Sequence, residues 1–201
     1  MLCLINDRFV PYNEAHLHVS DIGLQRGYGI FDYFLAVHGS IPFFEDYLDR
    51  FFYSAKMLNL DFQLSREELK EKIRYLIQQN QPERSGIKLL LTGGYSEDLY
   101  TPTGQNLLIL NLPMSHHPGD LIGGIKLMLL DYIRFRPEIK TTFYLPTLSM
   151  MPELRKQGAT EVLYHNNGAV SETTRANIFI IKQGKLITPS EGILKGVTRM
   201  H

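Results

Sequence analysis

The stretch "AVSETTRANIFII", residues 169–181, is the part of the sequence from which the fold can be argued. It reads as a strand, a polar turn and a second strand, and Glu172 stands where the first strand ends. Residues 173–176 separate this acid from Asn177 and the apolar run that follows. A carboxylate at the end of a strand, next to hydroxyls and a small side chain, leaves room for a flat ring beside it.

The sequence around this stretch predicts a mostly β region with one helix. Hairpins are expected on Asn167-Gly168 and Gln183-Gly184, because Asn-Gly and similar pairs favour tight hairpin turns. Upstream, residues 125–133 read as a strand and residues 147–158 as a helix that ends at Gly158. Pro152 is expected to kink this helix or to mark its first turn. Residues 192–201 read as the beginning of a further helix.

The first half of the chain mixes expected hairpins and helices. Residues 4–15 predict a hairpin, and residues 26–44 predict a second one with its turn at Gly39-Ser40. From Phe44 onward the apolar residues recur at three- and four-residue steps, which indicates a helix. Ser65 and Glu68 form a capping box at the start of another helix, and residues 86–94 and 106–113 read as strands.

This order of elements predicts an α+β protein of two domains. The turn-rich residues 114–124 are the expected boundary, with a small α/β domain over residues 1–117 and a larger, mostly β domain over residues 118–201. The sheet of the second domain looks incomplete at the carboxyl end.

Composition excludes several classes of protein. Lys plus Arg and Asp plus Glu number 21 each, so the chain lacks the basic excess that nucleic-acid or membrane-surface binding favours. A single cysteine, Cys3, allows no internal disulfide. The sequence contains no apolar run of membrane-spanning length and no signal-peptide pattern, so we expect a cytoplasmic protein. The histidines lack supporting acids or cysteines, and no metal site is predicted.

Lys140 supplies the second candidate residue. In "RPEIKTTFYLPTL", residues 136–148, it follows a strand and precedes an apolar helix, and an apolar wall favours the neutral amine. A neutral amine can form a Schiff base with an aldehyde cofactor. Pyridoxal phosphate needs such a lysine, a carboxylate for its pyridine nitrogen and donors for its phosphate. Glu172 fits the second role. Arg134 and Arg136 read as part of a solvated face.

Several motifs resemble one family in its own order: "RGYGIFDYF", "FFEDYLDRFFYSAKML", "IKTTFYL", "VSETTRANIFII", "GKLITP" and "GILKGVTR". The chain is similar along nearly its whole length to the class IV, or fold type IV, pyridoxal-phosphate aminotransferases. That family includes branched-chain aminotransferase, D-amino acid aminotransferase and aminodeoxychorismate lyase. The resemblance implies a two-domain fold type IV enzyme whose larger domain is a pseudo-barrel, and it implies a homodimer.

The resemblance also implies roles for single residues. Lys140 matches the Schiff-base lysine, and Glu172 matches the partner of the pyridine nitrogen. The remaining cofactor-binding matches are Arg50 and Thr198 with Val197 at the phosphate, Leu194 against the ring and Tyr144 at the phenolic oxygen. Phe31, Tyr33 and Tyr95 are the candidates for lining the substrate pocket.

The sequence departs from the family in three places. Tyr47 stands where a histidine usually precedes the phosphate arginine by three residues. The loop "TGGYSEDLYTP" has Asp98 and Tyr100 roughly where D-amino acid aminotransferases carry an arginine and a histidine for the substrate carboxylate, and Phe31 replaces a tyrosine. Family members continue for several tens of residues beyond the "GVTR" motif, whereas the given sequence stops at His201.

The expected function is amino transfer between a small, branched-chain or related, amino acid and a 2-keto acid. Two alternatives stay open at this point. An aminodeoxychorismate lyase would use the same lysine and glutamate, and a degenerate family member would bind cofactor or partner without turnover. The substrate and its D or L configuration are not fixed by the sequence.

Overall fold

The computed structural model describes residues 1–114 and 123–201, and their contacts divide the chain into two compact units. The first unit contains Met1–His116 and Lys140–Phe143, and the second contains His117–Ile139 and Tyr144–His201. The domain boundary predicted between residues 117 and 118 lies outside the described residues.

The first unit is built on a five-stranded antiparallel sheet in the order β2-β1-β5-β4-β3. The first two strands form the predicted hairpin, which turns at Asn6 with its φ of 55°. A 3-10 helix, Tyr12–Glu14, follows it. The strands are β1 (Leu2–Ile5), β2 (Arg8–Pro11), β3 (Gly29–Val37), β4 (Arg84–Thr92) and β5 (Asn106–Pro113).

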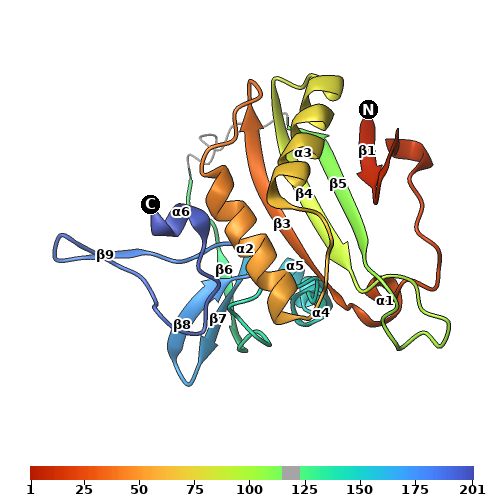
Figure 1. Cartoon of the computed structure of the whole chain (residues 1–201). Coiled ribbons are helices and arrows are strands. Elements are labelled where there is room, and N and C mark those ends of the chain that lie inside the picture. Colours follow the sequence, from red (N-terminus) through yellow and green to blue (C-terminus); the bar gives the residue numbers. More distant parts are fainter. Residues whose placement is uncertain (115–122) are drawn as a thin grey trace. The chain divides into compact units, whose positions relative to one another are not determined.

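Two helices, α2 (Phe44–Met57) and α3 (Arg66–Asn80), cover one face of this sheet (Figure 1). Strand β3 alternates as a half-buried strand should, with its even-numbered residues 30 to 36 buried. The capping box predicted at the start of α3 is confirmed, because the Ser65 and Glu68 side chains each bond the other residue's backbone N–H. The largest fully buried side chains of this core include Phe34, Phe51, Leu48, Leu69, Ile73, Leu76, Ile87, Leu89 and Leu91.

The hairpin predicted over residues 26–44 is wrong. Residues 22–26 form a short helix, α1 (Ile22–Arg26), and β3 pairs along its whole length with β4. Beyond β3 only a single bridge joins Val37 to Ser40. His38 and Gly39 both take positive φ angles there, and Phe43, with a φ of 54°, precedes the first residue of α2. The chain therefore turns tightly and enters a helix before a return strand can form.

Strand β3 is the last strand of the sheet, and residues 140–142 pair with the outer edge of its first three residues, 29–31. The Phe31 N–H donates to the Lys140 carbonyl at 2.9 Å, and the Thr142 N–H donates to the Gly29 carbonyl at 3.0 Å. The Lys140 N–H reaches Ser54 Oγ of α2 at 3.4 Å. Because the edge of β3 and helix α2 both hold it, the backbone at Lys140 is part of the first unit.

The second unit contains a three-stranded sheet in the order β6-β7-β8 and a separate β9–β10 hairpin. The hairpin turns predicted at Asn167-Gly168 and Gln183-Gly184 are confirmed, since all four residues have positive φ. The predicted helix over residues 147–158 is two shorter helices, with Pro152 in the first turn of the second. The elements are β6 (Leu127–Asp131), α4 (Leu145–Ser149), α5 (Met151–Lys156), β7 (Glu161–Asn166), β8 (Ala169–Thr173), β9 (Ile180–Lys182), β10 (Lys185–Ile187) and α6 (Val197–Met200).

A small apolar core holds the sheet of the second unit to its helices. It joins Met128 of β6 and Val162 of β7 to Leu154 of α5. Thr147 of α4 and Tyr164 of β7 share a buried hydrogen bond. The parallel pairing of β6 with β7 needs a crossover connection, and α4 with α5 lies in that connection.

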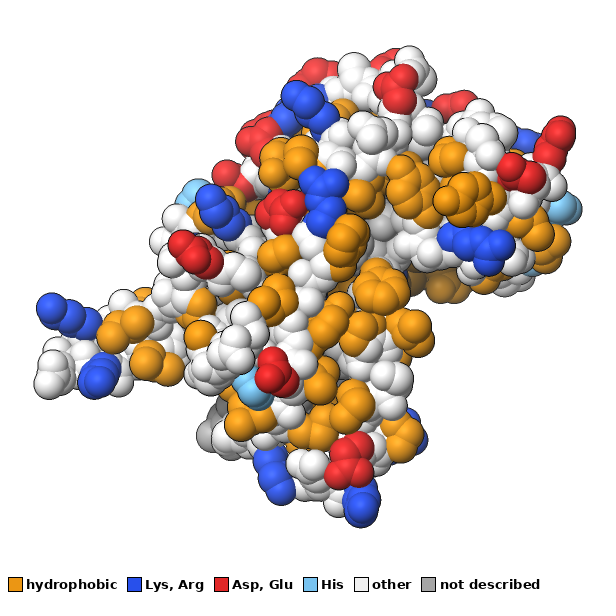
Figure 2. Space-filling view, turned by 90° about the horizontal axis from the view of Figure 1, so that it is seen from below, with side chains coloured by type: hydrophobic (Ala, Val, Ile, Leu, Met, Phe, Trp, Pro, Cys, Tyr) orange, Lys and Arg blue, Asp and Glu red, His pale blue; other side chains and the backbone are white. Residues whose placement is uncertain are grey.

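The surface carries both signs of charge. Figure 2 shows Lys and Arg side chains interspersed with Asp and Glu on the face it presents, as a chain of zero formal net charge should. Among the described residues, no helix has the length and apolar character that crossing a membrane requires.

Asp21 generates a stability prediction for the first unit. Its buried carboxylate accepts from Gly23 N, Thr92 Oγ1 and Asn106 Nδ2, each at 2.7 Å, and so caps α1 and ties it to β4 and β5. Asp21→Ala leaves three donors without their acceptor and is expected to lower the free energy of unfolding by about 3 kcal/mol or more. Urea unfolding followed by circular dichroism measures this loss.

The control is Asp61→Ala, which removes an exposed carboxylate and is expected to change stability by less than about 0.5 kcal/mol. Equal losses for the two variants would contradict the role given to Asp21.

Candidate active site

Glu172 is a buried carboxylate whose two oxygens are both bonded. It lies near the end of β8, as the sequence predicts, and is 3% exposed. Oε1 accepts from Arg134 Nε at 2.7 Å, and Oε2 accepts from the Leu194 N–H at 3.0 Å. A cation and a backbone donor within hydrogen-bonding distance favour the ionised form of a carboxylate. The second unit therefore presents a fixed, buried negative charge.

Asn177 joins this carboxylate to the start of α6. Its Nδ2 donates to the Leu194 carbonyl at 2.8 Å and reaches Glu172 Oε2 at 3.5 Å. Its Oδ1 accepts from the Gly196 N–H at 3.2 Å. The turn over residues 173–176 returns the chain so that Asn177 forms a bridge with Glu172. The side chain of Glu172 and the backbone at Leu194 and Gly196 thus meet at one amide side chain.

Helix α6 carries the two residues expected at a phosphate. It begins at Val197, which is buried, and Thr198 follows on the exposed side. Arg199 fixes the helix, because Nη2 donates to the Pro189 carbonyl at 2.9 Å. The structure therefore brings Glu172, Leu194 and the Val197–Thr198 pair together within the second unit.

Tyr144, expected at the cofactor's phenolic oxygen, precedes α4 in the same unit. Burial raises the pKa of its hydroxyl above the ordinary value, while the positive charge of Arg134 acts in the opposite direction. The net shift is upward, so Tyr144 is a neutral phenol at physiological pH. A neutral phenol can donate a hydrogen bond to an anionic oxygen.

Lys140 and Phe31 lie together in the first unit. The Lys140 Nζ is 4.7 Å from the centroid of the Phe31 ring, and Lys88 Nζ of β4 is 5.3 Å from the same centroid. Phe31 is on the face of β3 opposite to the buried, even-numbered residues. The aromatic side chain predicted for the substrate pocket therefore contacts the predicted Schiff-base lysine.

Arg50 is held by a buried acid that the sequence analysis missed. Its Nε and Nη2 donate to Asp32 Oδ2 and Oδ1 at 2.9 and 2.6 Å, and Asp32 is fully buried. This bidentate pair orients the guanidinium through two of its five N–H donors. Tyr47, which replaces the family's histidine, stacks at 5.3 Å from the Arg50 guanidinium carbon.

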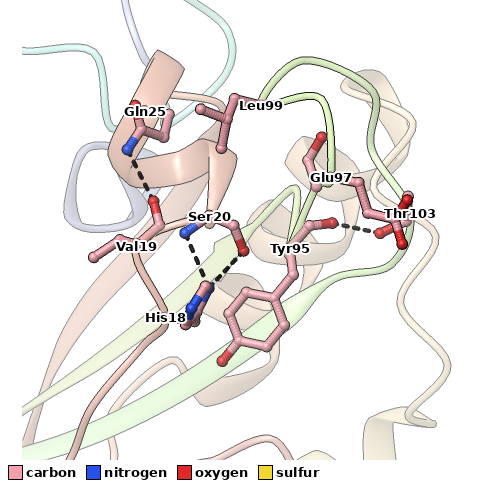
Figure 3. Close-up of a pocket in the computed structure, with 9 residues that line it drawn as sticks. His18, Val19, Ser20, Gln25, Tyr95, Glu97, Leu99 and Thr103 are labelled. Carbon is pink, nitrogen blue, oxygen red and sulfur yellow. Dashed lines mark hydrogen bonds between the residues drawn. The ribbon is translucent and has the colours of Figure 1, made fainter.

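The other two aromatic candidates lie in different places. Tyr33 is on the same face of β3 as Phe31, its hydroxyl donates to Met114 Sδ at 3.3 Å, and burial raises its pKa. Tyr95 instead lines an open hollow with His18, Ser20 and Glu97, where Thr103 bonds its carbonyl (Figure 3). Neither Phe31 nor Tyr33 contributes to the lining of that hollow.

Asp98 stabilises the loop beside this hollow. Its carboxylate accepts from the backbone N–H groups of Tyr100 and Thr101 and from the hydroxyls of Ser96 and Thr101. The hydroxyl and backbone of Thr101 are the main reason why the pKa of Asp98 is well below its ordinary value. Asp98, which the resemblance places roughly at a substrate-binding arginine of D-amino acid aminotransferases, therefore bonds its own loop.

Three residues of these networks were not predicted as site residues: Asp32, Asn177 and Arg134. The expectation that Arg134 belongs to a solvated face is wrong, because its side chain is only 16% exposed and pairs with Glu172. Asp32 carried a signal in the sequence, since an acid on the buried face of a strand requires a partner. Asn177 and Arg134 gave no such signal.

Gly196 generates a prediction for this network. A Cβ atom at Gly196 would lie 2.1 Å from Asn177 Oδ1, although its φ of −62° suits any residue. Gly196→Ala is expected to displace the Asn177 amide and to destabilise the protein by about 1–3 kcal/mol. Thermal unfolding measures the shift. Gly124→Ala, whose Cβ meets nothing within 4 Å, is the control and is expected to unfold as the wild type does.

The sequence and the structure of this chain are similar to those of several known proteins. A Methanocaldococcus jannaschii protein provisionally named as a branched-chain-amino-acid aminotransferase is 30% identical over 99% of this chain and 72% of its own length. The D-alanine aminotransferase of Staphylococcus aureus is 30% identical over 98% of this chain and 72% of its own length. The solved branched-chain aminotransferase of Thermoproteus uzoniensis, crystallised with norvaline, superposes with a TM-score of 0.86 at 26% identity.

That superposition covers 100% of this chain and 72% of the solved one, and it confirms the predicted α+β, fold type IV architecture. The amino-transferase class IV family matches residues 29–201, which include every predicted cofactor residue. The chain belongs to the class IV aminotransferase family.

Proposed function

We propose that this protein is a pyridoxal-phosphate-dependent aminotransferase that moves an amino group between a small amino acid and a 2-keto acid. The observation that carries the proposal is the buried, ion-paired Glu172 in a chain of the class IV family. A carboxylate on a sheet is rarely buried unless its charge is tightly paired or has a role in binding or catalysis. In this family the charge has a use, because the pyridine nitrogen of the cofactor is a base.

The chemistry of the described side chains fits the cofactor. Glu172 supplies the ionised carboxylate for the ring nitrogen, and Tyr144 supplies a neutral phenol for the phenolic oxygen. Arg50 supplies N–H donors for the phosphate, together with Val197 and Thr198 at the start of α6. Leu194, which is buried, supplies an apolar surface for the ring. Bound pyridoxal phosphate contributes an aldehyde that captures amines and a ring that withdraws electrons.

Lys140 carries the proton transfer in this proposal. Its primary amine would hold the cofactor and, once released, would act as the base that takes the α-proton of the substrate and gives it back. The bonds of its backbone to β3 and α2 keep the amine in place during both steps. A negatively charged Glu172 would favour the protonated form of the ring nitrogen. Phe31 and Tyr33 are proposed to contact the substrate.

The first test combines a lysine variant with a screen of amino donors. Lys140→Ala is expected to lose the yellow colour of bound cofactor, to resist borohydride fixation and to lower activity at least about 100-fold, because the proton carrier is gone. L- and D-amino acids, branched and unbranched, are offered with 2-oxoglutarate or pyruvate, and keto-acid formation is measured. The control is Lys182→Ala, which removes an exposed lysine of β9.

Activity that survives in Lys140→Ala would overturn the mechanism. Pyruvate released from 4-amino-4-deoxychorismate without a keto-acid partner would favour the lyase alternative.

We also propose that the enzyme works as a homodimer. The resemblance to the family implies a homodimer, and the first unit has large apolar side chains in water: Val19, Leu24 and Tyr100 are 65%, 69% and 75% exposed. An interface would remove such side chains from water. Sedimentation velocity is expected to show twice the mass of the 23.1 kDa chain, and Leu24→Asp is expected to shift the population toward monomer. A single-chain mass at every concentration would contradict the proposal.

A further inference from the structure

Arg134 makes a set of contacts that a solvated arginine would not make. Its Nε donates to Glu172 Oε1 at 2.7 Å, its Nη1 donates to the Ile139 carbonyl at 3.2 Å, and its Nη2 donates to the Pro137 carbonyl at 2.5 Å. All three nitrogens of the guanidinium are therefore bonded. One acceptor is the acid on β8, and the other two belong to the loop that the arginine itself begins.

The loop contacts of Arg134 reach the residue that precedes Lys140. Residues 132–139 connect β6 to Lys140, and Ile139, whose carbonyl Arg134 binds, is the residue before Lys140. The Ile139 N–H is also bonded, to the Arg136 carbonyl at 2.9 Å. The peptide group that leads into Lys140 is thus fixed by the same side chain that pairs with Glu172.

The ion pair is largely withdrawn from water. The side chains of Arg134 and Glu172 are 16% and 4% exposed. A guanidinium remains charged at any physiological pH, so it can compensate a buried carboxylate where a neutral donor cannot. The other donors described here at Glu172, the Leu194 N–H and the more distant Asn177 amide, carry no positive charge. A buried carboxylate that loses its cation either takes up a proton or moves.

We propose that Arg134 is a positioning residue: it holds Glu172 ionised and in one orientation, and it fixes the peptide that leads into Lys140. The inference rests on the proposed function, because it assigns to Arg134 a purpose that exists only if Glu172 serves a cofactor. It adds a residue that acts through two others without touching the reacting atoms.

Two substitutions separate the two parts of this role. Arg134→Lys keeps a positive charge near Glu172 but loses the planar fork that reaches the Pro137 and Ile139 carbonyls. Arg134→Met keeps an apolar stem of similar length and loses both the charge and the fork. The matched control is Arg136→Met, since Arg136 lies in the same loop and pairs at 3.2 Å with Glu138 at a more exposed position.

The experiment first uses the chain without added cofactor. Urea unfolding of the wild type, Arg134→Met, Glu172→Gln and the double variant forms a double-mutant cycle. If the two residues act as a pair, the double variant is expected to lose no more stability than the worse single variant. Fully additive losses would show that the ion pair is not coupled and would overturn the proposal.

The second readout uses pyridoxal phosphate, and it is one that a merely structural role would not move. Arg134→Met and Glu172→Gln are both expected to weaken cofactor binding about tenfold or more. Both are also expected to raise the pH at which the visible absorption of the bound cofactor changes. A ring nitrogen without its proton no longer repels the proton on the Lys140 nitrogen, so that proton is held to higher pH. Arg136→Met is expected to match the wild type in both measurements.

Arg134→Lys is expected to restore the absorption titration, because the charge is kept, but not the full affinity. Arg134→Lys also provides the test of this inference if Arg134→Met does not fold. Suppose that both Arg134 variants bind pyridoxal phosphate and change its absorption with pH as the wild type does, while Glu172→Gln does not. That result would overturn the role proposed for Arg134 but not the proposed function. Unaltered values in Glu172→Gln itself would instead refute the proposed function, whatever the Arg134 variants show.

Discussion

A carboxylate that leaves water needs donors for both of its oxygens, and this requirement organises both units of the protein. Asp21 meets it with three neutral donors and so joins α1 to β4 and β5. Asp32 meets it with the guanidinium of Arg50, and Glu172 with that of Arg134. The first acid therefore joins elements of the fold, whereas the other two each pair with an arginine, and we propose that Arg50 and Glu172 of these pairs bind the cofactor.

The two ion pairs differ in what they leave available. Asp32 takes only part of the Arg50 guanidinium, which suits a cation that must also bind an anion. All three guanidinium nitrogens of Arg134 donate hydrogen bonds, to Glu172 and to the carbonyls of Ile139 and Pro137. This arrangement suits a cation that holds these groups in place. The difference shows how one kind of interaction can orient a binding group in one unit and support an acid in the other.

Local signals in the sequence were sufficient for much of the fold. The capping box at Ser65 and the turns at Asn167-Gly168 and Gln183-Gly184 depend on residues that are close in sequence, and all were predicted. The hairpin over residues 26–44 was predicted wrongly, because the partner that β3 selects is decided by packing rather than by the turn at its end. Arg134 and Glu172 are separated by 38 residues, and nothing local connects them. Family resemblance supplied the role of Glu172 but not its cation.

The edge pairing of residues 140–142 with β3 has a consequence for how the chain is made. Ile30 and Phe31 pair with residues that lie more than a hundred positions later in the sequence, so this end of the β3 edge can be paired only after that later segment has been synthesised. An unpaired strand edge can form hydrogen bonds with a strand of another nascent chain. The lysine that we propose to be catalytic therefore lies on the same segment that pairs with this end of the strand edge.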